Sequence, residues 1–192
     1  MKLILASASP RRIELLTLAG YAFDVQATDT DETQLPQEAP EAYVRRVALA
    51  KAQSVVTCEP ALILGADTTV VLDGECLGKP GDAEAATHML HRLSGRSHEV
   101  LTGVAIRRST DAVCRVTHER TLVTFDDLPA AWIADYVASG EPFGKAGAYA
   151  IQGRAGTRIT RIEGNYHNVV GLPMASVIRL LDELRLLDEP RR

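Results

Sequence analysis

The sequence of 192 residues is poor in cysteine and contains no C-x-x-C pair. Its three cysteines, Cys58, Cys76 and Cys114, are odd in number and widely spaced. Disulfide frameworks normally use an even set, whereas scattered thiols are typical of a reducing compartment. The sequence also lacks an apolar run long enough to cross a bilayer, and polar residues interrupt the apolar N-terminus before a signal-peptide core could form. We therefore expect a cytoplasmic protein without disulfides.

An excess of positive charge is also absent, and aromatic residues are few. The net charge is -4, and the chain has one tryptophan, five tyrosines and three phenylalanines. Proteins that bind nucleic acids or anionic membranes normally carry a broad excess of lysine and arginine, and single strands are held by stacked aromatic side chains. The sequence therefore argues against nucleic-acid and membrane partners. A small anionic ligand at a local positive site is still allowed.

Several common catalytic motifs are missing. Lys79 is followed by Pro80 instead of Ser or Thr, which excludes a P-loop, and no G-x-G-x-x-G dinucleotide motif is present. The G-x-S-x-G and H-E-x-x-H motifs do not occur either. His88 and His91 are three residues apart, a spacing that an exposed helix face explains better than a zinc site. Serine-hydrolase triads and structural zinc are thus poor explanations of the sequence.

The hydrophobic pattern predicts an α/β fold with a mixed sheet. Strands and helices occur without strict alternation, which argues against a regular doubly wound sheet. No linker-like stretch is present, so residues 1–192 are expected to form one domain. Helices are predicted at residues 10–20, 41–57, 82–94, 129–139 and 173–187; extended segments at 2–6, 21–27, 62–66, 70–77, 98–107, 112–125 and 157–162; and a frayed tail at 188–192.

The first candidate site is the segment from Ser7 to Arg12, between the first strand and the first helix. Ser9 and Pro10 are typical of the N-cap and first positions of a helix. Helix N-termini favour anions, and Arg11 and Arg12 could clamp phosphate oxygens. These arginines oppose the helix dipole, and a bound anion would remove that conflict. The alternative is a surface helix with two solvated arginines.

Three further charged residues occupy positions that suggest ligand binding. Lys51 continues an apolar helical stripe, so its ammonium should meet an anion of the protein or of a ligand, unless the side chain extends to solvent. Asp67 stands at the expected end of a buried strand, where it could hold a divalent metal, orient a water or simply cap a turn. Lys79, between Gly78 and Pro80, is a candidate phosphate ligand because these neighbours restrain it.

Five ordered motifs resemble those of the Maf family of nucleotide pyrophosphatases and cover nearly the whole chain. They are A-S-A-S-P-R-R at residues 6–12, G-A-D-T at 65–68, G-K-P at 78–80, K-A-G-A-Y-A-I-Q-G at 145–153 and N-V-V-G-L-P at 168–173. The resemblance implies an elongated mixed β-sheet flanked by helices, with two lobes around a nucleotide-binding cleft. It also implies a homodimer, and a divalent metal cation, Mg²⁺ or Mn²⁺, that assists cleavage between the α and β phosphates.

The same resemblance implies roles for individual residues. Asp67 is expected to be the general base, and Glu32 is expected to lie with Asp67 near the metal. The remaining roles are phosphate binding by Ser7, Arg11, Arg12, Lys51 and Lys79, and specificity through Arg12, Thr68 and Gln152. One departure is Gly144, where many relatives have Asp, so one acidic group is missing here.

The string around Gln152 resembles the branch that prefers dTTP and UTP, whereas the branch acting on 7-methyl-GTP more often has Glu-Gly there. A glutamine amide offers both a donor and an acceptor, which match the N3–H and carbonyl of a uracil-like edge. Hydrolysis of dTTP and UTP, and of modified pyrimidine nucleotides, to monophosphate and pyrophosphate is therefore expected. Two alternatives stay open: a nucleotide-sensing regulator of septum formation without essential turnover, and a pyrophosphatase acting on 7-methyl-GTP.

Overall fold

The computed structural model describes residues 1–186, which form two compact units. Unit 1 comprises residues 1–67, residues 102–119 and the described residues from 171 onward; unit 2 comprises residues 68–101 and 120–170. The prediction that residues 1–192 form one domain with two lobes stays a prediction. The tail that was expected to fray, 188–192, lies outside the described residues.

The strands form a mixed seven-stranded sheet in the order β2-β1-β3-β5-β6-β7, with β4 paired to β3. β1 is parallel to β2 and to β3, whereas β4 is antiparallel to β3 and β7 is antiparallel to β6. The predicted mixed α/β fold is therefore confirmed. The strands are β1 (Lys2–Leu5), β2 (Asp24–Val25), β3 (Ala61–Leu72), β4 (Glu75–Leu77), β5 (Ser97–Arg108), β6 (Cys114–Phe125) and β7 (Ile159–Glu163).

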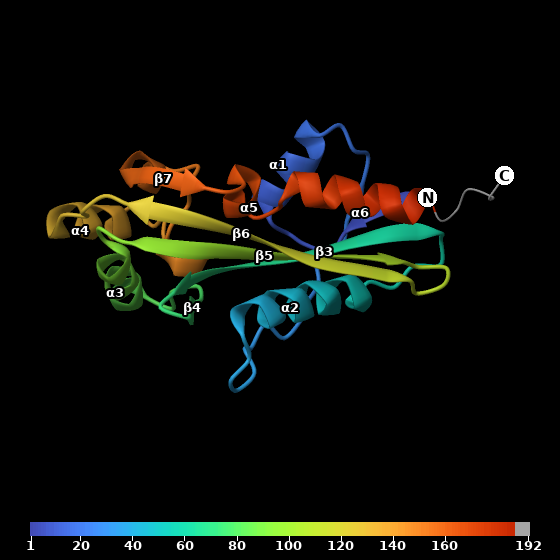
Figure 1. Cartoon of the computed structure of the whole chain (residues 1–192), viewed down its shortest axis with the longest axis horizontal. Helices are drawn as coiled ribbons and strands as arrows, with labels where there is room; N and C mark the ends of the chain where they lie inside the picture. Colours follow the sequence, from blue (N-terminus) through green and yellow to red (C-terminus); the bar gives the residue numbers. More distant parts are fainter. Residues whose placement is uncertain (187–192) are drawn as a thin grey trace. The chain divides into compact units, whose positions relative to one another are not determined.

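The helices agree closely with the sequence pattern, apart from one short helix that was not predicted, α5. In unit 1, α2 lies on one face of the strands, and α1 and α6 lie on the other (Figure 1). None of the helices in residues 1–186 is both long and apolar enough to cross a membrane. The helices are α1 (Pro10–Leu18), α2 (Pro40–Ser54), α3 (Ala83–Leu93), α4 (Ala130–Ala138), α5 (Tyr166–Val170) and α6 (Met174–Leu186), with 3₁₀ turns η1 (Ala146–Ala148) and η2 (Arg154–Arg158).

Two glycines allow α2 to pack unusually close to the sheet in unit 1. A Cβ atom added at Gly65 of β3 would lie 2.2 Å from the Ala48 carbonyl oxygen. At Gly103 of β5, it would lie 2.1 Å from the Val44 carbonyl oxygen. Real Cβ atoms do not approach backbone this closely, so any side chain at either position would push the helix away. The backbone of α2 is thus held directly against two strands.

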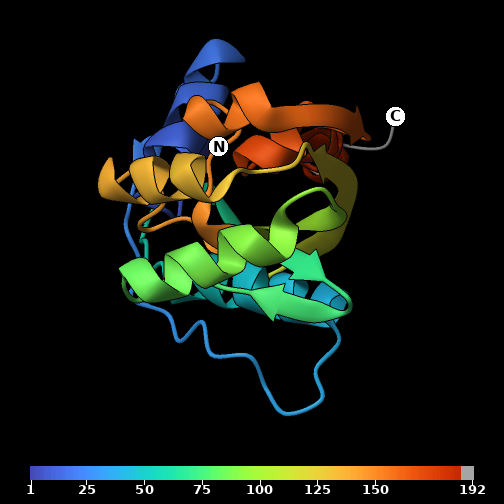
Figure 2. The ribbon, with the colours of Figure 1, turned by 90° about the vertical axis from the view of Figure 1, so that its left-hand side faces the viewer.

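In unit 2, α3 and α4 pack against each other (Figure 2). The Asp82 carboxylate accepts a hydrogen bond of 2.8 Å from the Ala85 amide and caps α3, which agrees with the helix predicted from residue 82. β3 and β4 are joined by Asp73 and Gly74, whose φ angles of 54° and 81° are those of a tight hairpin turn. His88, as expected, lies on the exposed face of α3.

Two predictions of local structure were wrong, and the prediction for Ser9 was confirmed only for its position. Asp67 does not end a strand: β3 runs without a break from Ala61 to Leu72, because Thr68 and Thr69 are β-branched and favour an extended backbone. Ser9 stands at the N-cap of α1, but its side chain makes no capping hydrogen bond. The extended segment predicted at 21–27 forms only the two-residue strand β2.

Candidate functional site

Lys51 lies between two carboxylates in unit 1. Its Nζ atom is 2.7 Å from Oδ1 of Asp67 and 2.6 Å from Oε1 of Glu32. Lys51 and Asp67 are only 7% and 6% exposed, so the lysine does not reach out to solvent. A buried ammonium is costly unless it is paired. The prediction that Lys51 meets an anion is therefore confirmed, and in this structure the anions belong to the protein.

The position of this ion pair follows from the alternation of side chains along β3. Residues two apart on a strand share a face, so Asp67 lies on the same face as Gly65. Gly65 contacts α2 at Ala48 and Ala52, and Lys51 lies on the same buried stripe of that helix. The close approach at Gly65 therefore brings the Lys51 ammonium to the Asp67 carboxylate.

Arg12 is buried next to the ion pair, with only 8% of its surface exposed. Its Nε donates a hydrogen bond of 2.9 Å to the Gly171 carbonyl, and its Nη1 donates one of 3.2 Å to Ser7 Oγ. Burial lowers the pKa of the guanidinium, while the charges of Asp67 and Glu32 oppose that shift. The alternative of a solvated arginine therefore does not hold for Arg12.

We refer to this group as the Lys51 cluster; its members are Ser7, Arg12, Glu32, Lys51 and Asp67. Arg11 lies beside the cluster in the first turn of α1, and its positive charge also lowers the pKa of Arg12. The cluster formally balances two cations against two carboxylates, and Arg11 adds one further positive charge. Anionic phosphate oxygens would therefore find cationic donors here that are already in place.

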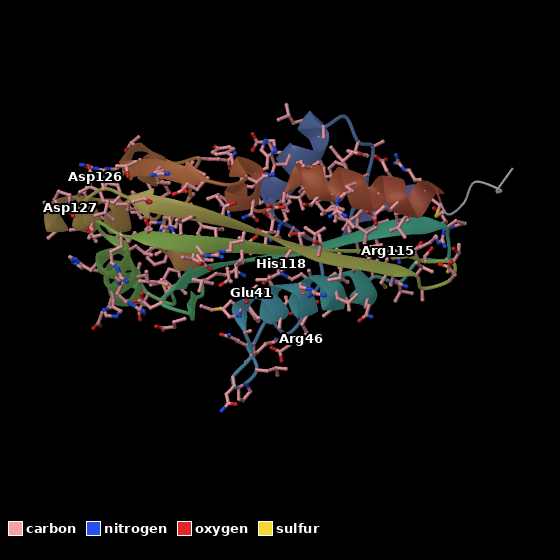
Figure 3. All side chains as sticks on the ribbon, in the orientation of Figure 1. Glu41, Arg46, Arg115, His118, Asp126 and Asp127 are labelled. Carbon is pink, nitrogen blue, oxygen red and sulfur yellow. The ribbon has the colours of Figure 1, made fainter. Side chains whose placement is uncertain are left out.

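The loop that carries Glu32 is fastened to α2 by two side chains. The Tyr43 hydroxyl donates a hydrogen bond of 2.9 Å to the Glu32 carbonyl. Arg46, which Figure 3 labels on α2, forms an ion pair of 2.7 Å with Glu38 and donates to the Thr33 carbonyl at 2.9 Å. This pairing lowers the pKa of the Glu38 carboxyl. Glu32 thus lies near Lys51 because α2 holds the surrounding loop.

The remaining predicted site residues belong to unit 2. Lys79 and Gln152 are exposed and Thr68 is partly exposed. The segments that carry Lys79 and Gln152 are joined, because the Gly147 amide donates a hydrogen bond of 3.1 Å to the Gly78 carbonyl. Gly147 has a φ of 66°, and a Cβ there would lie 2.8 Å from the Val70 side chain of β3. The roles of Lys79, Thr68 and Gln152 stay predictions.

Glu32 and Asp67 are the residues that suit a divalent cation. Across residues 1–186, no group of three or more His, Cys, Asp or Glu side chains is placed to hold a metal ion. The two carboxylates nevertheless converge on one cation, the Lys51 ammonium. Mg²⁺ is commonly bound by one or two carboxylates together with substrate phosphates, so this donor set fits such an ion. Gly144 contributes no side-chain oxygen.

Sequence reasoning missed the backbone and side-chain groups that support the Lys51 cluster. The Gly171 carbonyl, which receives the Arg12 hydrogen bond, is 159 residues away in the chain. Gly171 lies in the N-V-V-G-L-P motif, but no local pattern links that motif to Arg12. Tyr43 and Arg46 were also missed, since their spacing on α2 resembles that of ordinary surface residues. Only the fold shows what these groups contact.

Comparison with known proteins gave a consistent result. Residues 2–184, a range that contains every candidate residue, match the family described as Maf-like protein. The chain is 51% identical over 183 residues to the dTTP/UTP pyrophosphatase of Symbiobacterium thermophilum, an alignment covering 95% of this chain and 93% of that protein. It is 48% identical over 192 residues to the dTTP/UTP pyrophosphatase of Shigella dysenteriae serotype 1, covering 98% and 96%.

Proposed function

The chain belongs to the Maf family, and on this premise we propose that it hydrolyses dTTP and UTP to the monophosphate and pyrophosphate. Because its relatives are named dTTP/UTP pyrophosphatase, the chain is a nucleoside triphosphate pyrophosphatase. The observation that carries the proposal is the buried Lys51–Asp67 pair beside Arg12, which combines an acidic group with phosphate-binding cations. Modified pyrimidine nucleotides are proposed as further substrates.

The cations of unit 1 bind and orient the triphosphate. Arg12 is held by Ser7 and Gly171, so its guanidinium loses little further freedom when it contacts a phosphate oxygen. Arg11 and Lys51 add positive charge to the same region, and we assign Lys79 of unit 2 to the same task. These groups stabilise the negative charge that grows on the departing pyrophosphate.

Asp67 is proposed as the general base. Its Oδ1 accepts a hydrogen bond from Lys51, which fixes the carboxylate, and Oδ2 is assigned to take a proton from water. The water oxygen forms a bond to the α phosphorus, and the bond from that phosphorus to the bridging oxygen breaks. The electron pair of that bond leaves with pyrophosphate.

Glu32 and Asp67 would hold the divalent cation, with Mg²⁺ or Mn²⁺ as the proposed cofactor. When bound, such an ion supplies Lewis-acid polarisation and neutralises charge on the phosphate oxygens. With the ion bound, the Lys51 ammonium either stays paired with the same two carboxylates or turns to a phosphate oxygen. Gln152 is proposed to recognise the base through its donor and acceptor, with Arg12 and Thr68 as the other specificity positions. A homodimer and a cytoplasmic location also stay predictions.

The experiment is a panel of dTTP, UTP, CTP, ATP, GTP and 7-methyl-GTP with Mg²⁺ or Mn²⁺, in which pyrophosphate release is measured. We expect turnover of dTTP and UTP that falls at least about a hundredfold in Asp67→Asn, the scale of general-base catalysis. Asp126→Asn is the matched control, because Asp126 is an exposed acid after the end of β6 (Figure 3).

The other outcomes discriminate between the alternatives. Turnover concentrated on 7-methyl-GTP would contradict the pyrimidine assignment. Nucleotide binding without turnover in the wild-type protein would favour the sensing regulator. An Asp67→Asn variant as active as wild type would refute the general-base role of Asp67 but not the proposed reaction.

A further inference from the structure

The turn that carries Gln152 is closed by its own backbone. The Gly153 amide donates a hydrogen bond of 3.1 Å to the Ala150 carbonyl, so residues 150–153 form a tight turn in unit 2. Gln152 is exposed within this turn. Its amide can therefore reach a ligand, but its direction depends on how firmly the turn is held.

Glu141 holds the C-terminal side of the turn. Its Oε2 accepts a hydrogen bond of 3.3 Å from the Arg154 amide, and its Oε1 accepts one of 3.0 Å from the Tyr136 hydroxyl. A Cβ atom added at Gly153 would lie only 1.9 Å from Oε1. The carboxylate thus lies directly against the backbone of the residue that follows Gln152, and a side chain at position 153 would displace it.

Tyr136 holds the other side of the turn. The residue is fully buried in the core of unit 2, and its ring stacks on Trp132 with centroids 4.8 Å apart. Burial and the Glu141 carboxylate raise the pKa of the phenol, which a hydrogen bond from the Ala150 backbone opposes. The protonated hydroxyl thus contacts Ala150 directly and reaches Arg154 through Glu141.

The root of the turn is fixed by a second aromatic group. The hydroxyl of Tyr149 is 2.7 Å from Nε2 of His98, and the Tyr149 ring packs edge-on against Phe125 with centroids 4.9 Å apart. Tyr149 is only 6% exposed. The chain therefore enters the turn from an immobilised residue, which leaves the Tyr136 and Glu141 contacts to set its direction.

We propose that Tyr136 and Glu141 are positioning residues that fix the orientation of Gln152 and thereby its choice between uracil-type and cytosine-type bases. This rests on the proposed function, in which Gln152 recognises the base. Uracil and cytosine exchange donor and acceptor at two adjacent positions, so a glutamine amide in one orientation pairs with only one of them. A loosened turn lets the amide adopt both orientations, and discrimination is lost.

The test compares Tyr136→Phe and Glu141→Gln with wild type in steady-state hydrolysis of UTP and CTP. Tyr136→Phe removes only the hydroxyl and keeps the ring that stacks on Trp132. In Glu141→Gln, one carboxylate oxygen becomes an amide nitrogen, so either the Tyr136 hydroxyl or the Arg154 amide loses its acceptor. We expect the preference for UTP over CTP, as a ratio of kcat/KM, to fall about tenfold, mainly through KM for UTP. The inhibition constant of inorganic tripolyphosphate should stay unchanged, since it probes phosphate binding alone.

Two matched controls and one readout independent of activity complete the test. Tyr166→Phe and Glu163→Gln make the same chemical changes at exposed positions of unit 2 and should leave the ratio at its wild-type value. Hydrogen exchange of the amides of Ala150 and Arg154 should accelerate in the Tyr136 and Glu141 variants, while amides of α3 keep their protection. Acceleration throughout unit 2 would indicate a general loss of stability and would contradict the proposal.

Gln152→Ala separates the two levels of inference. If this variant keeps the wild-type ratio, base recognition by Gln152 fails, and the positioning proposal fails with it. A second outcome is that Gln152→Ala lowers the UTP-to-CTP ratio of kcat/KM while Tyr136→Phe and Glu141→Gln keep the wild-type ratio and the wild-type exchange protection. In that case the positioning proposal alone is overturned.

Discussion

Acidification should destabilise the protein through one buried histidine. His98 is 2% exposed, and burial lowers its pKa to about 4. In the part of the chain that the structure describes, its Nδ1 has no hydrogen-bond partner, so a second proton on the ring would not be stabilised. The imidazole is therefore neutral in the folded protein at neutral pH, whereas the unfolded chain has a histidine pKa of about 6.5.

The sign and size of the effect follow from these two pKa values. At pH values well above about 6.5 the imidazole is neutral in both states, and its contribution does not change with pH. As the pH falls from there toward about 4, the unfolded state binds one more proton than the folded state, so the free energy of unfolding decreases. Between about pH 7.5 and about pH 5, the loss is about 2 kcal/mol.

Urea unfolding at these two pH values measures the effect in wild type, His98→Gln and His88→Gln. Carboxylates that titrate in the same range contribute equally to all three proteins, so only differences between them matter. His98→Gln keeps a polar group near Tyr149 and should lose about 2 kcal/mol less than wild type on acidification. His88→Gln, an exposed control on α3, should behave as wild type. Equal losses in wild type and His98→Gln would refute the reasoning.

Two further predictions concern the Lys51 cluster. Gly65→Ala should lower the free energy of unfolding by about 2 kcal/mol or more and reduce kcat/KM, because the added Cβ would push α2 away. Gly81→Ala is the control, because a Cβ at position 81 would meet nothing within 4 Å. Lys51→Met should destabilise the protein by about 3 kcal/mol, since the buried Asp67 carboxylate loses its ion-pair partner and two carboxylates then face the single cation of Arg12. Urea unfolding measures both, and a Lys51→Met variant as stable as wild type would contradict the buried ion pair.

Local patterns were sufficient to predict what depends on near neighbours in the chain. The helical stripe placed Lys51 on the buried face of α2, and the pattern predicted a helix from residue 82, where Asp82 caps α3. The end of β3 was misplaced because a carboxylate within a buried strand looks like a terminus when its partner is not visible. That partner, Lys51, is 16 residues away, and no periodicity links the two.

Contacts between distant segments could not be predicted in the same way. The Arg12 side chain donates one of its hydrogen bonds to Gly171, and the Gln152 turn is held by Tyr136 and Glu141. The Maf-like motifs contain Arg12, Gln152 and Gly171 and indicated that their segments matter together, whereas Tyr136 and Glu141 lie outside these motifs. They did not show which atom of one segment meets which atom of another, because that depends on packing that no single segment encodes.

Because β3 is uninterrupted, the position of the Asp67 carboxylate depends on the register of this strand. β1 and β3 are aligned with Leu3 opposite Leu62 and Leu5 opposite Leu64, and three residues farther along β3 the Asp67 carboxylate meets Lys51. Neighbouring side chains on a strand point to opposite faces, so a slip of one residue would present a methyl or a hydroxyl group where the carboxylate now stands. Insertion or deletion of a single residue between Leu64 and Asp67 would therefore remove the acid while leaving its codon intact.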